Sequence, residues 1–428
     1  MAGNEALSRL LKVLKSSGAD AWEVTDTQEK GWEFYLIRHT LDQNRYKSLE
    51  NFRVKVYKKF EGFLGSAGAQ VPADADSTEM ERIVAGLCQD ASYVRNPCYS
   101  LNAPEAESTA APDGAGSADL RAISRDFLQA VSSLPETGGE DLNSCEIFVS
   151  EMRTRFLNSE GIDVTVARPS SMVEAVVNAR RDGREIELYR MYRCGTCDRE
   201  QLTRDLAETM RFGRDRLSAE PTPALGKANL ILSTDDACAV YEYFIYRLAA
   251  GMVHRGISDC KIGDTVAPAE MTVRTAAFLP NSSRNGAYDS EGARIRDVTL
   301  IDGGRAVRYW GSRQFSQYLG LKDSFIAENF TVSGGTASAE DLRAGDWLEV
   351  VEFSAFQVDD VTGDIAGEIR LAYLHKDGKT VPVCGGSVSG SMAELMKEMR
   401  FSVECRQYDT LLIPALTRLN GVTVTGAV

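Results

Sequence analysis

The stretch from Asn229 to Val266 constrains the fold most. It opens as a short apolar strand, Leu230–Leu232, and after a polar turn continues as a helix predicted over Ala237–Met252. This helix is apolar almost all round, which is typical of a helix buried inside a protein. It nevertheless carries Glu242 and several tyrosines, and a buried carboxylate or phenol needs a polar partner. The sequence therefore predicts a buried central helix that either holds a polar network or lines a cleft.

The chain is long enough for two domains. It has 428 residues, whereas a single hydrophobic core rarely grows beyond about 250–300 residues. Its net charge of −14 disfavours nucleic-acid binding, because an acidic surface repels phosphate groups. The nine cysteines are scattered without a regular framework, which is typical of a protein whose thiols are reduced. No apolar run of the sequence reaches the roughly 18 residues of a membrane span. We expect a cytoplasmic protein that binds neither nucleic acid nor a membrane.

Residues 1–224 are predicted to form an N-terminal domain with mixed sheets and helices. Strand-like segments dominate residues 21–67, and five more are expected between 144 and 192. The stretch 104–118 is rich in Pro, Ala, Gly and Ser without periodicity, which predicts a surface loop. A long charged helix then ends at the prolines of Pro221-Thr222-Pro223, and this break marks the predicted domain boundary.

Residues 225–428 are predicted to form a β-rich domain, barrel- or sandwich-like, around the central helix. Strand-like segments separated by Gly, Asp and Asn turns dominate this half. The clearest hairpin joins Ile365–His375 to Thr380–Cys384 across Lys376-Asp377-Gly378-Lys379. The predicted fold class is therefore α+β, with two domains and one buried central helix.

A series of motifs in fixed order runs through the C-terminal half. Its members are Asp359–Asp364, Gly367–Leu374, Val381–Val383 and Gly385–Gly390. Two turns that contain Ser-Glu-Gly come before them, at Thr154–Gly161 and at Tyr288–Gly292. Together these stretches resemble the TldD/PmbA family, whose members were labelled modulators of DNA gyrase and are now regarded as peptidases. The two turns are similar to the NSEG and DDEG turns of that family.

The resemblance implies a zinc site on the central helix. Active members of the family carry a His-Glu-x-x-x-His motif there, with a distant Cys as a further ligand. Counting back from the turn at Arg255–Ser258 places the motif on 241–246, so Glu242 is kept while both histidine positions are Tyr241 and Tyr246. The distant Cys matches Cys405.

These residue types make a poor zinc site. Zinc prefers imidazole, thiolate and carboxylate ligands, whereas a phenol has a pKa near 10 and keeps its proton at neutral pH. Without a metal-bound water, Glu242 has no activated water from which to take a proton. His254 lies just before the turn, but one histidine does not replace two. We therefore expect no metal and no other cofactor. Zinc is expected only if the chain is instead an active, divergent peptidase.

The expected function is that of a metal-free, non-catalytic subunit of the PmbA type, also called TldE. The resemblance implies pairing with a TldD/PmbA-type subunit, as a homo- or heterodimer, and binding of an extended peptide or unfolded segment for proteolysis. One alternative is an active, divergent peptidase that uses Glu242 with Cys405 and His254. Another is a protein-binding regulator with no part in proteolysis. The sequence leaves open whether the chain is an enzyme, and Glu242 is the candidate catalytic residue.

The segment Cys194-Gly195-Thr196-Cys197 is a CxxC motif. Zinc would need two further ligands, and a thioredoxin-like site would need a βαβ context. We interpret the motif as a loop with two thiols that face solvent.

Overall fold

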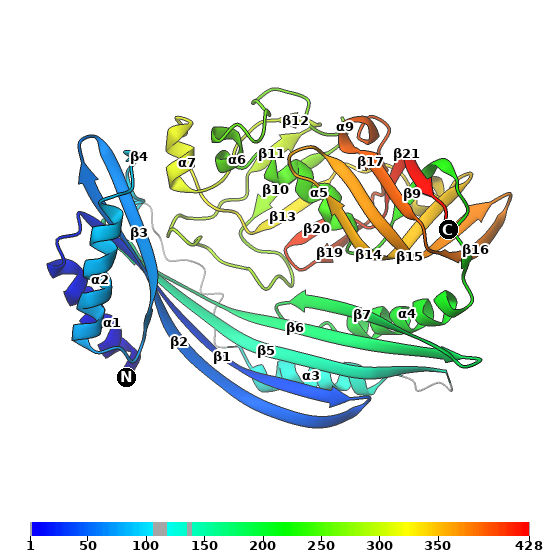
Figure 1. Cartoon of the computed structure of the whole chain (residues 1–428), viewed down its shortest axis with the longest axis horizontal. Coiled ribbons are helices and arrows are strands. Elements are labelled where there is room, and N and C mark those ends of the chain that lie inside the picture. The colour runs from blue at the N-terminus through cyan, green and yellow to red at the C-terminus, as the bar shows by residue number, and fades with distance from the viewer. Residues whose placement is uncertain (1, 106–117, 135–138, 428) are drawn as a thin grey trace.

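The computed structural model describes residues 2–105, 118–134 and 139–427 (Figure 1). A long curved sheet spans the N-terminal half, and a β-rich body formed by the C-terminal half lies above it. This arrangement confirms the predicted α+β class. The loop predicted at 104–118 falls almost entirely outside the described residues. Every helix of the described part is too short or too polar to cross a bilayer.

The N-terminal half is organised by one antiparallel sheet rather than several mixed sheets. Its strand order is β4-β3-β2-β1-β5-β6-β7. The strands are β1 (Ala21–Ile37), β2 (Thr40–Phe60), β3 (Phe63–Pro72), β4 (Asn96–Pro97), β5 (Glu140–Asn158), β6 (Asp163–Arg181) and β7 (Arg184–Cys194). The five short segments expected between 144 and 192 are parts of three long strands. Polar residues such as Arg153 interrupt the apolar pattern, yet they stay paired in the ladder.

Four helices cover one face of this sheet at its two ends. Helices α1 (Ala2–Ser16) and α2 (Ser77–Ala91) share a core with Val24 of β1, while α3 (Leu120–Ser132) and α4 (Arg199–Leu217) share another with Phe34. Val24 and Phe34 are ten residues apart on one strand, so both point to the same face. The middle of the sheet and its other face are not covered by these helices.

The C-terminal half contains a barrel. Its eight-stranded sheet has the order β14-β9-β21-β17-β15-β16-β8, and a further pairing of β14 with β15 closes five of the strands on themselves. The strands are β8 (Glu220–Pro221), β9 (Gly226–Leu232), β14 (Trp347–Val358), β15 (Asp364–Lys376), β16 (Lys379–Cys384), β17 (Ser387–Ser391) and β21 (Thr417–Thr425), with β18 (Arg400–Phe401) paired to β21. The predicted hairpin is confirmed, because Asp377 and Gly378 turn between β15 and β16 with positive φ.

A second, six-stranded sheet packs beside the barrel. Its order is β12-β11-β10-β13-β20-β19. The strands are β10 (Thr272–Ala276), β11 (Thr299–Asp302), β12 (Arg305–Ala306), β13 (Asn329–Ser333), β19 (Cys405–Tyr408) and β20 (Leu411–Pro414); the helices of this half are α5 (Ala237–Tyr246), α6 (Ala250–His254), α7 (Arg313–Tyr318), α8 (Ala339–Leu342) and α9 (Met392–Leu395). The buried residues of α5 share one core with strands of both sheets, which confirms the buried central helix.

Helix α5 is shorter than predicted. It ends at Tyr246 instead of continuing to Met252. The chain becomes extended at Ala249, which forms a bridge with Trp310, and the indole of Trp310 donates a 3.0 Å hydrogen bond to the carbonyl oxygen of Ile245. This contact stops the helix, and α6 begins one residue later.

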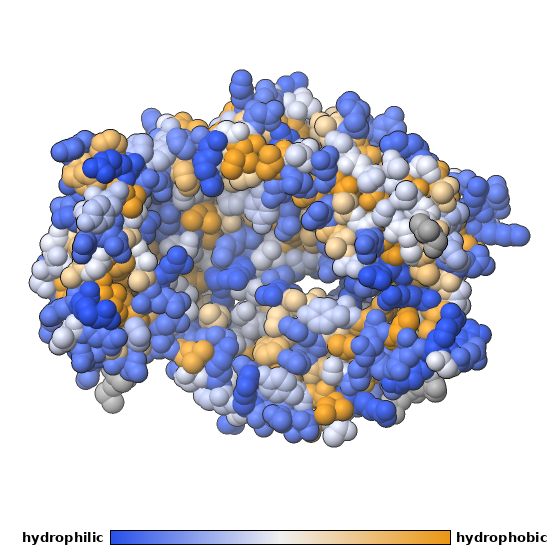
Figure 2. Space-filling view, viewed as in Figure 1, coloured by the Kyte–Doolittle hydropathy of each residue, from blue (hydrophilic) through white to orange (hydrophobic). Residues whose placement is uncertain are grey.

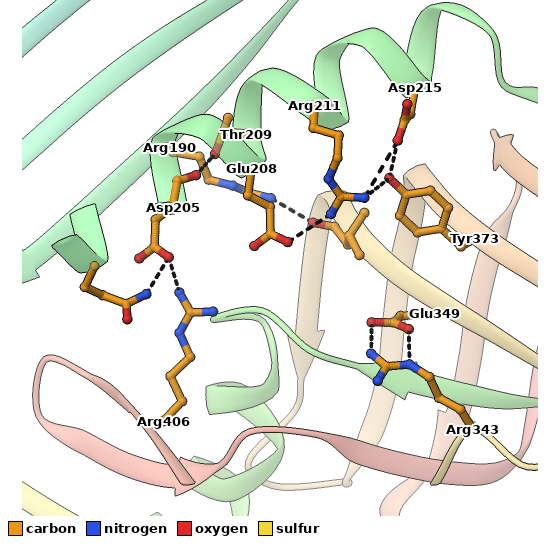
Figure 3. Close-up of polar contacts among 12 residues, drawn as sticks. Arg190, Asp205, Glu208, Thr209, Arg211, Asp215, Arg343, Glu349, Tyr373 and Arg406 are labelled. Carbon is orange, nitrogen blue, oxygen red and sulfur yellow. Dashed lines mark hydrogen bonds and ion pairs between the residues drawn. The ribbon is translucent and has the colours of Figure 1, made fainter. Parts of the chain in front are cut away.

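Helix α4 joins the two halves through its polar side chains (Figure 3). The carboxylate of Asp205 forms a 2.8 Å ion pair with Arg406, and Asp215 accepts a 2.6 Å hydrogen bond from the hydroxyl of Tyr373. Beside the helix, Arg190 of β7 donates to the carbonyl oxygen of Val351 at 2.7 Å. The long helix thus fixes the right-hand end of the sheet in Figure 1 to both sheets of the C-terminal half.

The two Ser-Glu-Gly turns form a second joint between the halves. In each turn the side-chain oxygen of Asn158 or Asp289 accepts from the backbone N–H groups two and four residues further on. Asn158 donates to the carbonyl oxygen of Asn102 at 2.7 Å, and the Asn102 amide donates to the backbone of the second turn. Gly292 packs so tightly that a Cβ there would stand 2.6 Å from the ring of Phe156.

Between these joints the molecule is open. Figure 2 shows a gap that passes between the curved sheet and the C-terminal half, bordered largely by hydrophilic residues. The two halves therefore touch at separate places and enclose space between them.

Candidate functional site

Tyr241 of α5 is fully buried. Its hydroxyl lies 2.7 Å from the hydroxyl of Thr417 at the start of β21, and its ring meets Phe401 edge-on. Burial raises the pKa of the Tyr241 phenol far above its ordinary value. The side chain is therefore a neutral group whose hydroxyl is hydrogen-bonded inside the core.

Glu242 and Tyr246 lie close to a carboxylate that sequence reasoning missed. Glu242 is half-buried; burial raises its pKa, and the negative charge of Asp360 raises it further. Tyr246 closes the helix against the ring of Trp310, and burial together with Glu242 and Asp360 raises its pKa to about 12. Asp360 lies in the β14–β15 turn, within the Asp359–Asp364 motif, so the motif was visible but its proximity to α5 was not.

Cys405 and His254 have other surroundings. Cys405 begins β19, and its thiol lies 3.8 Å from the carbonyl oxygens of Val332 and Val403. His254 is exposed at the end of α6, and its ring packs against Phe315 and Tyr318 of α7. In the part of the chain that the structure describes, no hydrogen bond or ion pair joins either residue to Glu242.

A polar cleft separates the free edge of β7 from the barrel. It has a volume of about 410 Å³, and its walls are 187–190 of β7 and 352–354 of β14. Arg216 and Arg370 also line it, and Arg190 of β7 reaches across it to pair with Glu352 of β14 at 2.5 Å. Strand β14 bulges here, with its register to β15 shifting between Val350 and Phe356. The bulge removes part of the barrel ladder beside the edge of the curved sheet.

Residues 225–426 match a family domain described as the PmbA/TldA metallopeptidase C-terminal domain. These residues belong to the TldD/PmbA family. The whole fold of the chain is similar to TldE from Thermococcus kodakarensis, with a TM-score of 0.78 and 16% identity over 98% of this chain and 100% of that one. A Thermotoga maritima protein named as a candidate modulator of a DNA gyrase gives a TM-score of 0.78 and 15% identity, over 99% and 100% of the two chains.

A curated relative is also known from Methanocaldococcus jannaschii. This uncharacterised protein is 23% identical over 282 residues. The match covers 61% of this chain and 64% of the relative, so it spans less than two thirds of that protein.

The zinc implied by the TldD/PmbA family does not fit the residues present. Tyr241 keeps its proton, and its hydroxyl is hydrogen-bonded to Thr417. A pKa of about 12 keeps Tyr246 neutral as well. Burial also raises the pKa of the Cys405 thiol, which disfavours the thiolate that zinc binds. Among the described residues, no group of three or more His, Cys, Asp and Glu side chains is placed to hold a metal ion.

The CxxC motif faces solvent only in part: Thr196 is exposed, but the two thiols are not on the open surface that the prediction gave them. Both cysteines are half-buried and pack against the core under α3 and α4. Burial raises the pKa of Cys194 and of Cys197 to about 12. The loop between them is held by Asn281, whose side chain accepts from the Thr196 N–H at 2.7 Å. The motif is a packed contact between the two halves.

Proposed function

We propose that this chain is a non-catalytic TldD/PmbA subunit, which pairs with another subunit of the family and holds an extended peptide for it. One observation carries the proposal. At the two positions where the family resemblance implies zinc-binding histidines, this chain has tyrosines. The buried phenol of Tyr241 is hydrogen-bonded to Thr417, and the phenol of Tyr246 stays protonated. A site of this kind lacks the metal ligands that would activate water for peptide hydrolysis.

The free edge of β7 supports the peptide-binding part of the proposal. A sheet edge presents unpaired N–H and C=O groups to which an extended peptide can add as a strand. This edge borders the polar cleft, where the bulge of β14 leaves room beside it. An extended peptide would pair with β7 and place its side chains near Arg216 and Arg370 of the cleft.

The catalytic part is tested on the purified chain, alone and with a zinc-bearing family member. We expect the chain alone to contain less than stoichiometric zinc and to leave unstructured peptides intact. The Glu242→Gln variant should support cleavage by the mixed subunits as well as the wild type does. Stoichiometric zinc, with cleavage by the chain alone that Glu242→Gln abolishes, would establish the divergent peptidase instead.

The binding part is tested with a fluorescent, unstructured peptide and a matched peptide methylated on alternate backbone nitrogens. Methylation removes the N–H donors that strand addition needs while keeping the side chains. We expect anisotropy to show binding of the first peptide and at least tenfold weaker binding of the second. Equal binding of both peptides would exclude strand addition. Absence of binding by either, with or without the partner, would favour the regulator that plays no part in proteolysis.

A further inference from the structure

An apolar groove lies on the helix-covered face of the curved sheet, between α3 and the far end of the β1–β2 hairpin. Its volume is about 500 Å³. Trp32, Phe34 and Leu36 of β1 form its floor, Leu41 of β2 one wall, and Leu128 of α3 the other. Its size and apolar lining are those of sites that bind small molecules.

The rim of this groove is positively charged. Arg121 and Arg125 are one turn apart on α3, both exposed, and both line the groove. Among the described residues, neither arginine has a carboxylate partner, although the chain carries a net charge of −14. The positive end of the α3 helix dipole does not add to this charge, because the N–H groups of Arg121 and Ala122 at that end already donate to the carboxylate of Asp119. The free positive charge is therefore that of the two guanidinium groups.

A buried hydroxyl lies between the two arginines. Ser124 lines the groove and is 5% exposed, and its Oγ has no hydrogen-bond partner within the described residues. A serine inside a helix ordinarily bonds its hydroxyl back to a carbonyl of the preceding turn. An unpaired buried hydroxyl is costly unless a ligand or a water satisfies it. The groove thus combines an apolar floor, an unused donor and two unpaired cations.

We infer that this groove binds an aliphatic carboxylate, a molecule with an unbranched apolar chain and one anionic head. The chain would lie over Trp32 and Phe34 and against Leu128. The carboxylate would accept hydrogen bonds from Arg121 and Arg125, whose planar guanidinium groups match its geometry, and from Ser124. This site is separate from α5 and from the cleft beside β7, so the inference does not depend on the proposed function.

The inference is tested by titrating the full chain with dodecanoate and measuring binding by calorimetry and by the change in tryptophan fluorescence. We expect one dodecanoate per chain. The double variant Arg121→Gln/Arg125→Gln should bind at least about tenfold more weakly, because charge-assisted hydrogen bonds are lost. The matched control Arg199→Gln/Arg204→Gln removes the same charge from α4 and should bind as the wild type does. Ser124→Ala should weaken binding a fewfold.

Two further measurements separate this site from non-specific uptake of a detergent-like molecule. Trp32→Phe should abolish the fluorescence change while calorimetry still detects binding. Dodecyltrimethylammonium, which has the same chain and a cationic head, should bind at least tenfold more weakly than dodecanoate. The inference is overturned if the wild type does not bind dodecanoate, if the arginine double variant binds it equally well, or if the cation binds as tightly.

Discussion

At the scale of single residues, burial decides what each polar group can do. Tyr241 stands where the family resemblance implies a histidine, yet its phenol is one half of a buried pair with Thr417. Asp26 of β1 is also buried, beside Glu50, and one of its oxygens has no partner in the described part of the chain. The first group stabilises the core, whereas the second costs free energy when it is ionised.

Replacing Tyr241 by Phe should destabilise the fold by about 1–3 kcal/mol, because the buried hydroxyl of Thr417 loses its partner. Thr417→Val should cost a similar amount for the same reason. The double variant should cost less than the sum of the two by at least about 0.5 kcal/mol, as expected for groups in contact. Urea unfolding measures all three. Strict additivity would mean that the two hydroxyls do not interact.

Asp26→Asn should stabilise the protein, and more so at pH 8 than at pH 5. Burial, together with the charge of Glu50, raises the pKa of Asp26 to about 6 from an ordinary value of 3.8. The folded state therefore holds this proton more tightly, and stability falls as the pH rises from about 4 through 6. At 1.36 kcal/mol per pKa unit, the gain at pH 8 is about 2–3 kcal/mol and roughly half of that at pH 5.

The measurement is urea unfolding of both proteins at the two pH values. Asp74→Asn, at an exposed turn, provides a control that should change stability little at either pH. A gain that is the same at pH 5 and pH 8 would show that the carboxylate of Asp26 is not ionising in this range.

At the scale of elements, local sequence explains where helices and strands exist better than where they end. The apolar run after Asp236 predicts α5 correctly, because such a run can only be buried. Its end depends on Trp310, which is remote in the sequence, so periodicity could not show it. The same holds for the site: the motif residues were visible, but the approach of Asp360 to Glu242 is a tertiary contact.

Helix α4 yields a prediction about the joint that it forms. Asp205→Asn should weaken the contact with Arg406 and loosen the two halves, since the carboxylate charge is lost while the shape is kept. We expect faster cleavage by a protease near residues 218–225, which connect the halves. Glu208→Gln is the matched control, because within the described ranges Glu208 pairs only with Arg211 of the same helix. Equal cleavage rates for both variants would contradict the proposed role of Asp205.

At the scale of the whole molecule, separate joints connect the curved sheet to the C-terminal half around an open space. They include α4, the CxxC loop held by Asn281, and the pair of Asx turns at Asn158 and Asp289. The sequence resemblance singled out both turns, but it could not show that they pack on each other. Their matching geometry suggests that these motifs set the relative position of the halves.

Gly292→Ala tests the turn joint. Gly292 has φ +72°, and an added Cβ would stand 2.6 Å from the ring of Phe156, so the variant should lose about 2–5 kcal/mol through backbone strain and overpacking together. Gly18→Ala has nearly the same φ, +75°, and open space around its Cβ, so it should lose only the strain, about 1–2 kcal/mol. Equal losses in thermal or urea unfolding would mean that the turns are not tightly packed.

The closure of the barrel limits where another chain can attach. Because β14 pairs with both β9 and β15, five strands of the barrel close on themselves, although β14 is paired with β9 over residues 348–350 alone. Beyond the closed strands, β16 continues the sheet to β8, which is only two residues long and whose Pro221 has no N–H to donate. An added strand therefore finds less free edge on the barrel than on β7 of the curved sheet or on the end strands of the six-stranded sheet.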